Sequence, residues 1–147
     1  MQVNNIIRNI EGNILDLGSG AGFPGLIIAI LEERKVHLVE SNSKKCAFLR
    51  EAIRITSCNA EVHNVRLTTK SAPILNISKV DIVTARAVTS LVNLLDIVFP
   101  IVYEDTYCIF HKGSHQPLVE TEKRMRAHHQ MSSRKILHGY NIRQSTQ

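Results

Sequence analysis

The 147-residue chain contains no tryptophan, few aromatic residues (5%) and no long uninterrupted apolar stretch. Without such a stretch the sequence predicts no membrane-spanning helix, which needs about 20 apolar residues in a row. The first seven residues lack the basic start and long apolar middle of a signal peptide. The scarcity of aromatic side chains also argues against an aromatic platform on which nucleic-acid bases would stack.

Cysteine is scarce as well, and its three positions form no recognisable site. Cys46, Cys58 and Cys108 are odd in number and have no metal-binding spacing, so we expect reduced thiols in a cytoplasmic protein. The sequence also shows no Ser/His/Asp set, no paired carboxylates and no metal-ligand pattern. We therefore expect no metal centre, no membrane association and no hydrolytic machinery of those kinds.

The net charge of +5 arises at one end of the chain. Residues 1–110 hold 11 basic and 11 acidic side chains, whereas residues 111–147 hold seven basic and two acidic ones, a difference of five. Five of the seven histidines also lie in this second segment. A basic segment attached to a neutral core indicates a polyanionic partner, most simply nucleic acid. A solvated helix face followed by a loose tail explains the charge equally well.

Strand-like and helix-like apolar patterns alternate along the chain. Strands are predicted at 13–17, 36–40, 60–65, 80–85, 107–111 and within 135–144, helices at 26–31, 44–57, 88–99 and 117–130, and an irregular segment at 70–79. Such alternation is typical of a mostly parallel α/β sheet with helices on both faces. We expect one domain covering residues 1–147.

The most specific motif is a glycine-rich turn after the first predicted strand. Asp16 is followed by the turn glycines Gly18, Gly20 and Gly22, and then by an apolar helix pattern. Glycine has no Cβ and tolerates positive φ, so a ligand can approach this backbone closely. The second predicted strand ends at Glu40, a position from which a carboxylate can bind both ribose hydroxyls of an adenosine. The motif therefore indicates a nucleotide-like ligand.

Two ligand classes fit this turn. The segment 20–25 matches the G-x-G-x-x-G fingerprint of dinucleotide-binding proteins, which would make the protein an NAD-dependent oxidoreductase. Pro24, however, has no N–H to offer a pyrophosphate at the helix start. The register from Asp16 to Gly22 resembles the first motif of class I S-adenosylmethionine-dependent methyltransferases, whose ligand has no pyrophosphate. We favour the second interpretation and keep the oxidoreductase as the weaker alternative.

Longer segments resemble one family within that class. They are the run Asp-Leu-Gly-Ser-Gly-Ala-Gly-Phe-Pro-Gly at 16–25, Val-Glu-Ser-Asn-Ser-Lys-Lys at 39–45, Phe-Leu-Arg-Glu at 48–51, Val-Thr-Ala-Arg-Ala at 83–87 and Lys-Gly at 112–113. These segments resemble the bacterial small-subunit ribosomal RNA guanine-N7 methyltransferases, the RsmG or GidB family. The resemblance covers roughly residues 12 to 113 well and the remainder loosely.

The resemblance implies a Rossmann-like class I methyltransferase fold, S-adenosyl-L-methionine as cofactor, and methylation of N7 of one guanine in 16S rRNA. Guanine N7 carries a lone pair and no proton, so its attack on the sulfonium methyl needs no general base. Alignment and electrostatics can supply the rate enhancement. The absence of an acid–base constellation is compatible with this chemistry.

The resemblance also implies roles for residues near the turn. The turn glycines would lie beneath the cofactor, with Phe23 lining it. Asp16 would lie near the methionine amino group, the alternative being an N-cap for the following helix. Glu40 would hold the ribose hydroxyls, the alternative being a surface carboxylate at a strand end. Leu67 and Thr68 replace the Ala-Glu pair that flanks the adenine in the family, so we expect an altered adenine wall.

Three cations follow predicted strands and would share one sheet edge. Arg86 matches an arginine that the family places at the active site, near cofactor and target base. Arg66 and Lys112 match basic positions that the family uses around RNA and cofactor. Arg86 and Lys112 are therefore candidate catalytic residues, and Arg86 is also a candidate cofactor-binding residue. All three cations are candidate substrate-binding residues. Each would otherwise be an ordinary surface cation or, for Arg86, an ion pair at a helix start.

Family members carry several tens of residues before the first strand, whereas 12 residues precede Asn13 here. The final segment also stops before a last strand. We therefore expect a shortened relative in which residues 1–12 are a remnant of an N-terminal helical segment and 111–147 form a basic C-terminal part. The first hypothesis is a monomeric enzyme acting on 16S rRNA of the small ribosomal subunit. The second is a catalytically impaired protein that binds only cofactor or RNA.

Overall fold

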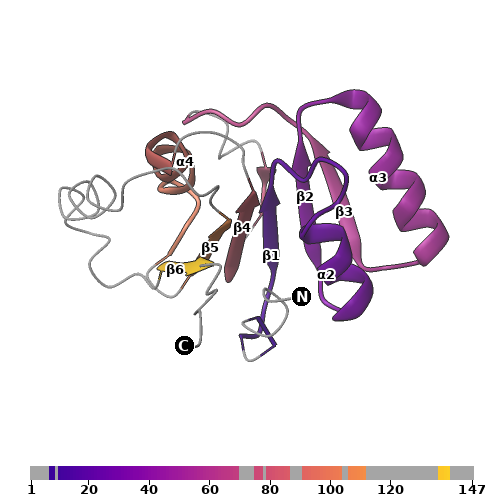
Figure 1. The fold of residues 1–147 in the computed structure, drawn as a ribbon, viewed down its shortest axis with the longest axis horizontal. Coiled ribbons are helices and arrows are strands. Elements are labelled where there is room, and N and C mark those ends of the chain that lie inside the picture. The colour runs from indigo at the N-terminus through magenta and orange to yellow at the C-terminus, as the bar shows by residue number, and fades with distance from the viewer. Residues whose placement is uncertain are drawn as a thin grey trace, which may run out of the picture.

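The structure, a computed structural model, describes residues 7–8, 10–69, 75–77, 79–86, 91–103, 106–111 and 136–139 (Figure 1). Its strands are β1 (Ile14–Leu17), β2 (Val36–Glu40), β3 (Ala60–Asn64), β4 (Ile82–Arg86), β5 (Tyr107–His111) and β6 (Ile136–Gly139). Its helices are α2 (Gly25–Leu31), α3 (Ser43–Thr56) and α4 (Leu91–Val98). None of the helices in these ranges has the length and apolar character needed to cross a bilayer.

The six strands form one sheet in the order β3-β2-β1-β4-β5-β6, and every neighbouring pair is parallel. This confirms the α/β fold predicted from the alternating pattern. From β1 the chain first builds outward through β2 and β3 and then returns to place β4 on the other side of β1. At such a switch point the loops leaving two neighbouring strands separate, and a crevice opens at the carboxyl edge of the sheet.

Helices cover both faces of the sheet, as the sequence predicted, and the strand residues alternate between two cores (Figure 1). In β1, Ile14 packs in the core that α2 and α3 cover. Leu15 and Leu17 pack in the core that α4 covers. Because successive strand side chains point to opposite faces, a strand buried on both sides is mostly apolar. This explains why apolar residues dominate the central strands.

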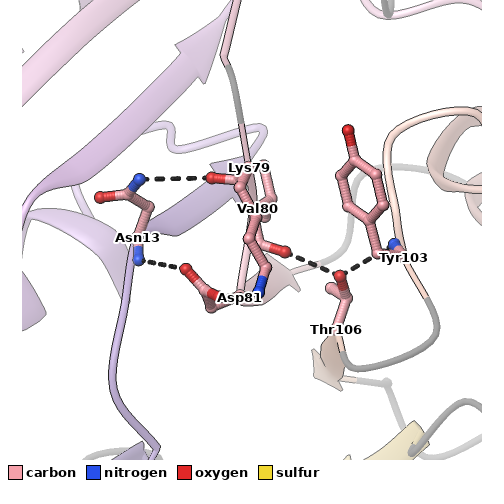
Figure 2. A network of polar contacts seen from close by, with 6 residues as sticks. All are labelled: Asn13, Lys79, Val80, Asp81, Tyr103 and Thr106. Atoms are coloured by element: carbon pink, nitrogen blue, oxygen red, sulfur yellow. Dashed lines mark hydrogen bonds and ion pairs between the residues drawn. The ribbon is translucent and has the colours of Figure 1, made fainter.

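Two small polar networks join the strands at the amino edge of the sheet, opposite the crevice (Figure 2). In the first, the backbone N–H of Asn13 donates to Asp81 Oδ2 at 2.8 Å, and the Asn13 side-chain amide donates to Lys79 O at 3.3 Å. The backbone N–H of Asp81 also donates to Asn13 O at 3.0 Å. These bonds fix the entry to β1 against the entry to β4.

The second network centres on Thr106, which is fully buried directly before β5. Its hydroxyl donates to Val80 O at 2.7 Å and accepts from the backbone N–H of Tyr103 at 3.0 Å (Figure 2). One side chain therefore binds two backbone groups from different segments. It couples the turn before β5 to the segment before β4.

Most predicted elements are confirmed, with shifts at their ends. β4 begins at Ile82 rather than at residue 80. Directly before it, the side chain of Asp81 accepts a hydrogen bond from the backbone N–H of Asn13. α3 ends at Thr56, and Ser57 closes it in a left-handed conformation. α4 is described from Leu91, and the residues 87–90 that precede it lie outside the described part of the chain. The predicted helix at 117–130 and most of the segment 70–79 also lie outside it.

Candidate functional site at the carboxyl edge of the sheet

A pocket of about 490 Å³ lies at the carboxyl edge, beside the point where the strand order reverses. Its walls come from the turn after β1, the end of β2, the segment after β3, and α4. Five residues that the sequence singled out line it, namely Gly18, Glu40, Arg66, Leu67 and Thr68. This volume falls within the usual range of small-molecule sites, about 300–1,000 Å³, and suits a ligand the size of a nucleoside.

The turn glycines all have positive φ, of 67° at Gly18, 57° at Gly20 and 95° at Gly22. The reason why the position must be glycine differs among them. A Cβ on Gly20 would meet only Gly18 O, at 3.7 Å, so its backbone faces open space. A Cβ on Gly22 would lie 2.7 Å from the Cβ of Leu26, so Gly22 serves the packing of the turn on α2. Gly18 and Gly20 therefore offer backbone to a ligand, and Gly22 supports them.

Glu40 is an acidic residue of the pocket wall, and it is largely buried, with 7% exposure. Its Oε2 accepts from the backbone N–H of Gly20 at 2.9 Å, and its Oε1 accepts from the backbone N–H of Asn42 at 2.8 Å. Burial opposes the charge, but these N–H groups and nearby Lys45 hold the pKa of the carboxyl below its usual value. An ionised carboxylate oxygen can accept more than one hydrogen bond, so Glu40 retains capacity for ribose hydroxyls.

Asp16 occupies a different environment, beneath the turn rather than on the pocket wall. It is 1% exposed, its Oδ1 accepts from Thr84 Oγ1 at 2.6 Å, and its Oδ2 accepts from the backbone N–H of Gly25 at 3.2 Å. Burial raises the pKa of this carboxyl to about 6, although the bonds from Thr84, Ser19 and Gly25 favour the charged form. The contacts match the second sequence-based interpretation, in which Asp16 holds the start of the following helix.

The first residue of α2, Gly25, must also be glycine, because a side chain at this position would collide with its neighbours. A Cβ on Gly25 would lie 2.5 Å from Asp16 Oδ2 and 2.6 Å from Leu38 Cδ2. The helix therefore approaches β1 and β2 more closely than it could with any other residue at position 25.

Gly22 and Phe23, which precede α2, lie outside the pocket lining, and the Phe23 side chain is 48% exposed. The predicted contact of Phe23 with the cofactor remains a prediction.

The predicted cations are distributed around the same edge. Arg66 lines the pocket, and its side chain is exposed. Arg86 is the last residue of β4, is exposed, and is in register with His111 of β5. It lies at the carboxyl edge but outside the lining of this pocket. Lys112 follows His111 directly and lies outside the described residues. The structure thus brings Arg66 and Arg86 to one edge, as the strand order predicted.

Sequence reasoning missed the contribution of α4 to the pocket. Asn93, Asp96 and Ile97 line its wall, although the segment was interpreted only as an apolar helix. Helix positions three apart lie on the same face, so Asn93 and Asp96 form a short polar strip along an otherwise apolar helix. That spacing was the available signal, and it identifies the side of α4 that faces away from the core.

Comparisons with known proteins identify the family of this chain. A family model described as GidB, rRNA small subunit methyltransferase G, matches residues 1–144. The ribosomal RNA small subunit methyltransferase G of Paramagnetospirillum magneticum is 49% identical over 113 residues, which are 77% of this chain and 53% of that protein. Its counterpart from Gluconobacter oxydans is 47% identical over 100 residues, or 68% of this chain and 49% of that protein. The chain spans about half the length of these curated relatives.

Solved structures show the same fold. An S-adenosylmethionine-dependent methyltransferase from Geobacter sulfurreducens, crystallised with S-adenosyl-L-homocysteine, superposes with a TM-score of 0.64 at 12% identity. The match covers 92% of this chain and 56% of that one, and establishes the Rossmann-like class I methyltransferase fold. The comparisons give no support to the NAD-dependent oxidoreductase or to the impaired protein. On the family match and on these two relatives, the chain belongs to the GidB family of rRNA small subunit methyltransferase G proteins.

Proposed function

We propose that this chain transfers a methyl group from S-adenosyl-L-methionine to N7 of a specific guanine in 16S rRNA. The observation that carries the proposal is the position of Glu40. This ionised carboxylate lies in the wall of a nucleoside-sized pocket and is hydrogen-bonded to the glycine turn at Gly20. Membership of the GidB family supports ribosomal RNA as the substrate and S-adenosylmethionine as the cofactor.

The residues of the pocket suit the adenosine part of this cofactor. Glu40 accepts hydrogen bonds from the ribose hydroxyls, and the backbone at Gly18 and Gly20 allows close approach. Leu67 and Thr68 flank the adenine from the segment after β3. When bound, the cofactor supplies an electrophilic methyl group on a sulfonium. The chain's task is to hold that group in line with the guanine, because correct alignment alone can remove a large part of the barrier.

The cations at the carboxyl edge bind and orient the RNA. Arg66 and Arg86 bind backbone phosphates and position the guanine, and Lys112 adds a third positive charge after β5. None of them has to remove a proton, because guanine N7 carries none, and the transfer itself requires no metal. Asp16 acts as a positioning residue, since it holds the glycine turn and the start of α2 in place.

We further propose that residues 1–147 belong to a single methyltransferase domain whose basic part, 111–147, contacts the RNA of the small ribosomal subunit. The protein acts as a monomer in the cytoplasm, where ribosomal particles assemble, and has no membrane partner. The charge difference between residues 1–110 and 111–147 supports this arrangement.

A radiolabelled methyl-transfer assay on 16S rRNA and on 30S particles that lack the modification tests the activity. We expect incorporation at N7 of one guanine, located by the chain cleavage that this modification permits. Arg86→Met should lose most incorporation and keep its affinity for S-adenosylhomocysteine within a few fold. Arg54→Met is the matched control, since Arg54 is an exposed α3 cation paired with Glu51, and it should behave as the wild type. A folded protein that binds S-adenosylhomocysteine and methylates neither substrate would contradict the proposal.

A further inference from the structure

Three side chains with metal-binding atoms meet on β2 and β3, away from the pocket. His37 Nδ1 lies 3.0 Å from His63 Nε2 and 3.8 Å from Glu61 Oε2, and all three ligand atoms lie within 4.8 Å of one another. The His37 side chain is 7% exposed and that of Glu61 is 53% exposed. The group is therefore open to solvent on the side of its carboxylate and closed on the side of its buried imidazole.

The register of the sheet creates this cluster. β2 and β3 pair His37 with Glu61 and Val39 with His63. Because strand side chains alternate, His37 and Val39 point to one face, and Glu61 and His63 point to that same face. The two histidines are 26 residues apart in the chain. No local spacing in the sequence therefore indicates a set of metal ligands, which is why the sequence alone predicted no metal site.

We propose that His37, Glu61 and His63 form a binding site for a divalent transition-metal ion such as Zn²⁺, with water as the fourth ligand. Imidazole nitrogen and carboxylate oxygen are typical Zn²⁺ ligands, and sites with three protein ligands keep one open position. With metal–ligand bonds of about 2.0–2.1 Å, tetrahedral coordination separates two ligand atoms by about 3.3 Å. The observed distances of 3.0 and 3.8 Å lie on either side of this value.

The two imidazoles are in a form that can bind a metal. Burial lowers the pKa of His37, as do His63 and Lys35, and burial also lowers the pKa of His63. Both rings are therefore neutral at pH 7. Without metal, one ring N–H lies between the two facing nitrogens. Coordination requires that ring to carry its hydrogen on its outer nitrogen instead, so the proton changes position within one imidazole and none is released.

Lys35 is the group that opposes the metal. Its Nζ lies 3.2 Å from Glu61 Oε2 and pairs with the carboxylate that the ion would need. The ammonium and the metal compete for the same oxygen, so removal of Lys35 should strengthen metal binding. A cluster that serves only as a hydrogen bond and an ion pair gives no such effect.

A metal here would fasten the edge strand to the body of the sheet. Among the strands that the structure describes, β3 is the outer one and pairs with β2. His37 and His63 each lie three residues before a pocket residue, Glu40 and Arg66 respectively. The ion would therefore clamp two strands directly beneath the walls of the pocket. This inference does not depend on the proposed methyl transfer.

Calorimetric titration of the untagged chain with Zn²⁺, and optical titration with Co²⁺, test the site. We expect one ion per chain with micromolar affinity and the visible absorption of a four- or five-coordinate Co²⁺ complex. Glu61→Gln should weaken binding by about tenfold or more, His37→Gln with His63→Gln should abolish it, and Lys35→Met should tighten it. The exposure of Glu61 and Lys35 means that these single variants keep the fold, which circular dichroism verifies.

His128→Gln with His129→Gln is the matched control, because it removes two imidazoles from the C-terminal segment and should leave the affinity unchanged. The proposal is wrong if Glu61→Gln and the His37/His63 pair bind Zn²⁺ as the wild type does, or if the His128/His129 control loses the ion. S-adenosylhomocysteine binding is measured on the same variants. Retained nucleoside binding with lost metal binding separates this site from the proposed activity.

Discussion

At the scale of single residues, one carboxylate connects the turn after β1 to the segment between β2 and α3. Glu40 ends β2, yet its side chain accepts the backbone N–H of Gly20 in the turn after β1. It also accepts the N–H of Asn42, which is the N-cap residue of α3. Glu40 therefore holds the glycine turn in position before any ligand arrives, and a bound ribose would use the remaining lone pairs of the same oxygens.

Glu40→Ala should weaken S-adenosylhomocysteine binding tenfold or more. A hydrogen bond to a charged group contributes about 1.5–3 kcal/mol, and the variant also leaves the N–H of Gly20 without its acceptor. Isothermal titration calorimetry measures the change. Glu11→Ala, at an exposed position before β1, is the control and should bind as the wild type. An unchanged affinity in Glu40→Ala would remove this residue from the binding site.

The second acidic residue, Asp16, links the stability of the fold to pH. The fold raises its pKa from 3.8 to about 6, so the folded chain holds a proton that the unfolded chain releases between these pH values. Stability from the protonated form is complete below about pH 4 and is lost as the pH rises through about 6. The difference is about 3 kcal/mol, from about 1.4 kcal/mol for each pKa unit.

Asp16→Asn should remove this dependence. An amide cannot ionise, so the unfolding free energy of the wild type relative to the variant should fall by about 2 kcal/mol between pH 4 and pH 7.5. Urea unfolding at a series of pH values measures it. Glu11→Gln should follow the wild-type curve. Parallel curves for Asp16→Asn and the wild type would show that Asp16 does not titrate differently in the folded chain.

At the scale of elements, the apolar runs were sufficient to place the strands and helices, and they failed mainly at the ends. The ends of these strands and helices depend on side-chain hydrogen bonds, which the periodicity of apolar residues does not reveal. β4 starts after Asp81 because that residue binds Asn13, and α3 starts after Asn42 because its side chain accepts from the N–H groups of Lys44 and Lys45. Only the second of these bonds is local, and only that boundary was predictable from capping preferences.

Thr106→Val tests how strongly such a bond holds neighbouring elements together. The substitution keeps the shape but leaves Val80 O and the N–H of Tyr103 without the hydroxyl that serves both. Buried polar groups without partners cost about 1–3 kcal/mol, so unfolding in urea should show a loss of this size. Thr56→Val is the control, since the Thr56 hydroxyl is exposed and bonds only within its helix. Equal stabilities for the two variants would contradict this role of Thr106.

At the scale of the whole molecule, the charge is unevenly distributed along the chain. Residues 1–110 are balanced, and the excess of five positive charges lies in 111–147. Arg66 and Arg86 add two exposed cations at the carboxyl edge. These two arginines would attract an RNA bound across this edge, and the net positive charge of the chain would speed its arrival.

RNA affinity should fall with salt, with a slope of roughly −0.7 in log–log form for each phosphate contacted on a single strand. Charge reversal of Lys123, Arg124 and Arg126 should flatten this slope, because fewer counterions are released on binding. Filter binding or fluorescence anisotropy over a salt series measures it.

The matched control for that series reverses three exposed cations of α3, namely Lys44, Arg50 and Arg54. It removes the same charge from a helix on the far side of the sheet from α4, and should preserve the slope. If both triple variants retain the wild-type slope, the predicted helix at 117–130 does not contact RNA.

The sequence by itself determined the fold class, the order of the elements and half of the site. Apolar alternation reports burial on two faces of a sheet. The residues at strand ends, Gly18, Glu40 and Arg66, must lie at one edge once the strands are parallel. Only the tertiary structure decided which side chains meet across strands and helices. The polar strip of α4 and the cluster of His37 and His63 depend on register and packing, which bring together residues that no local spacing relates.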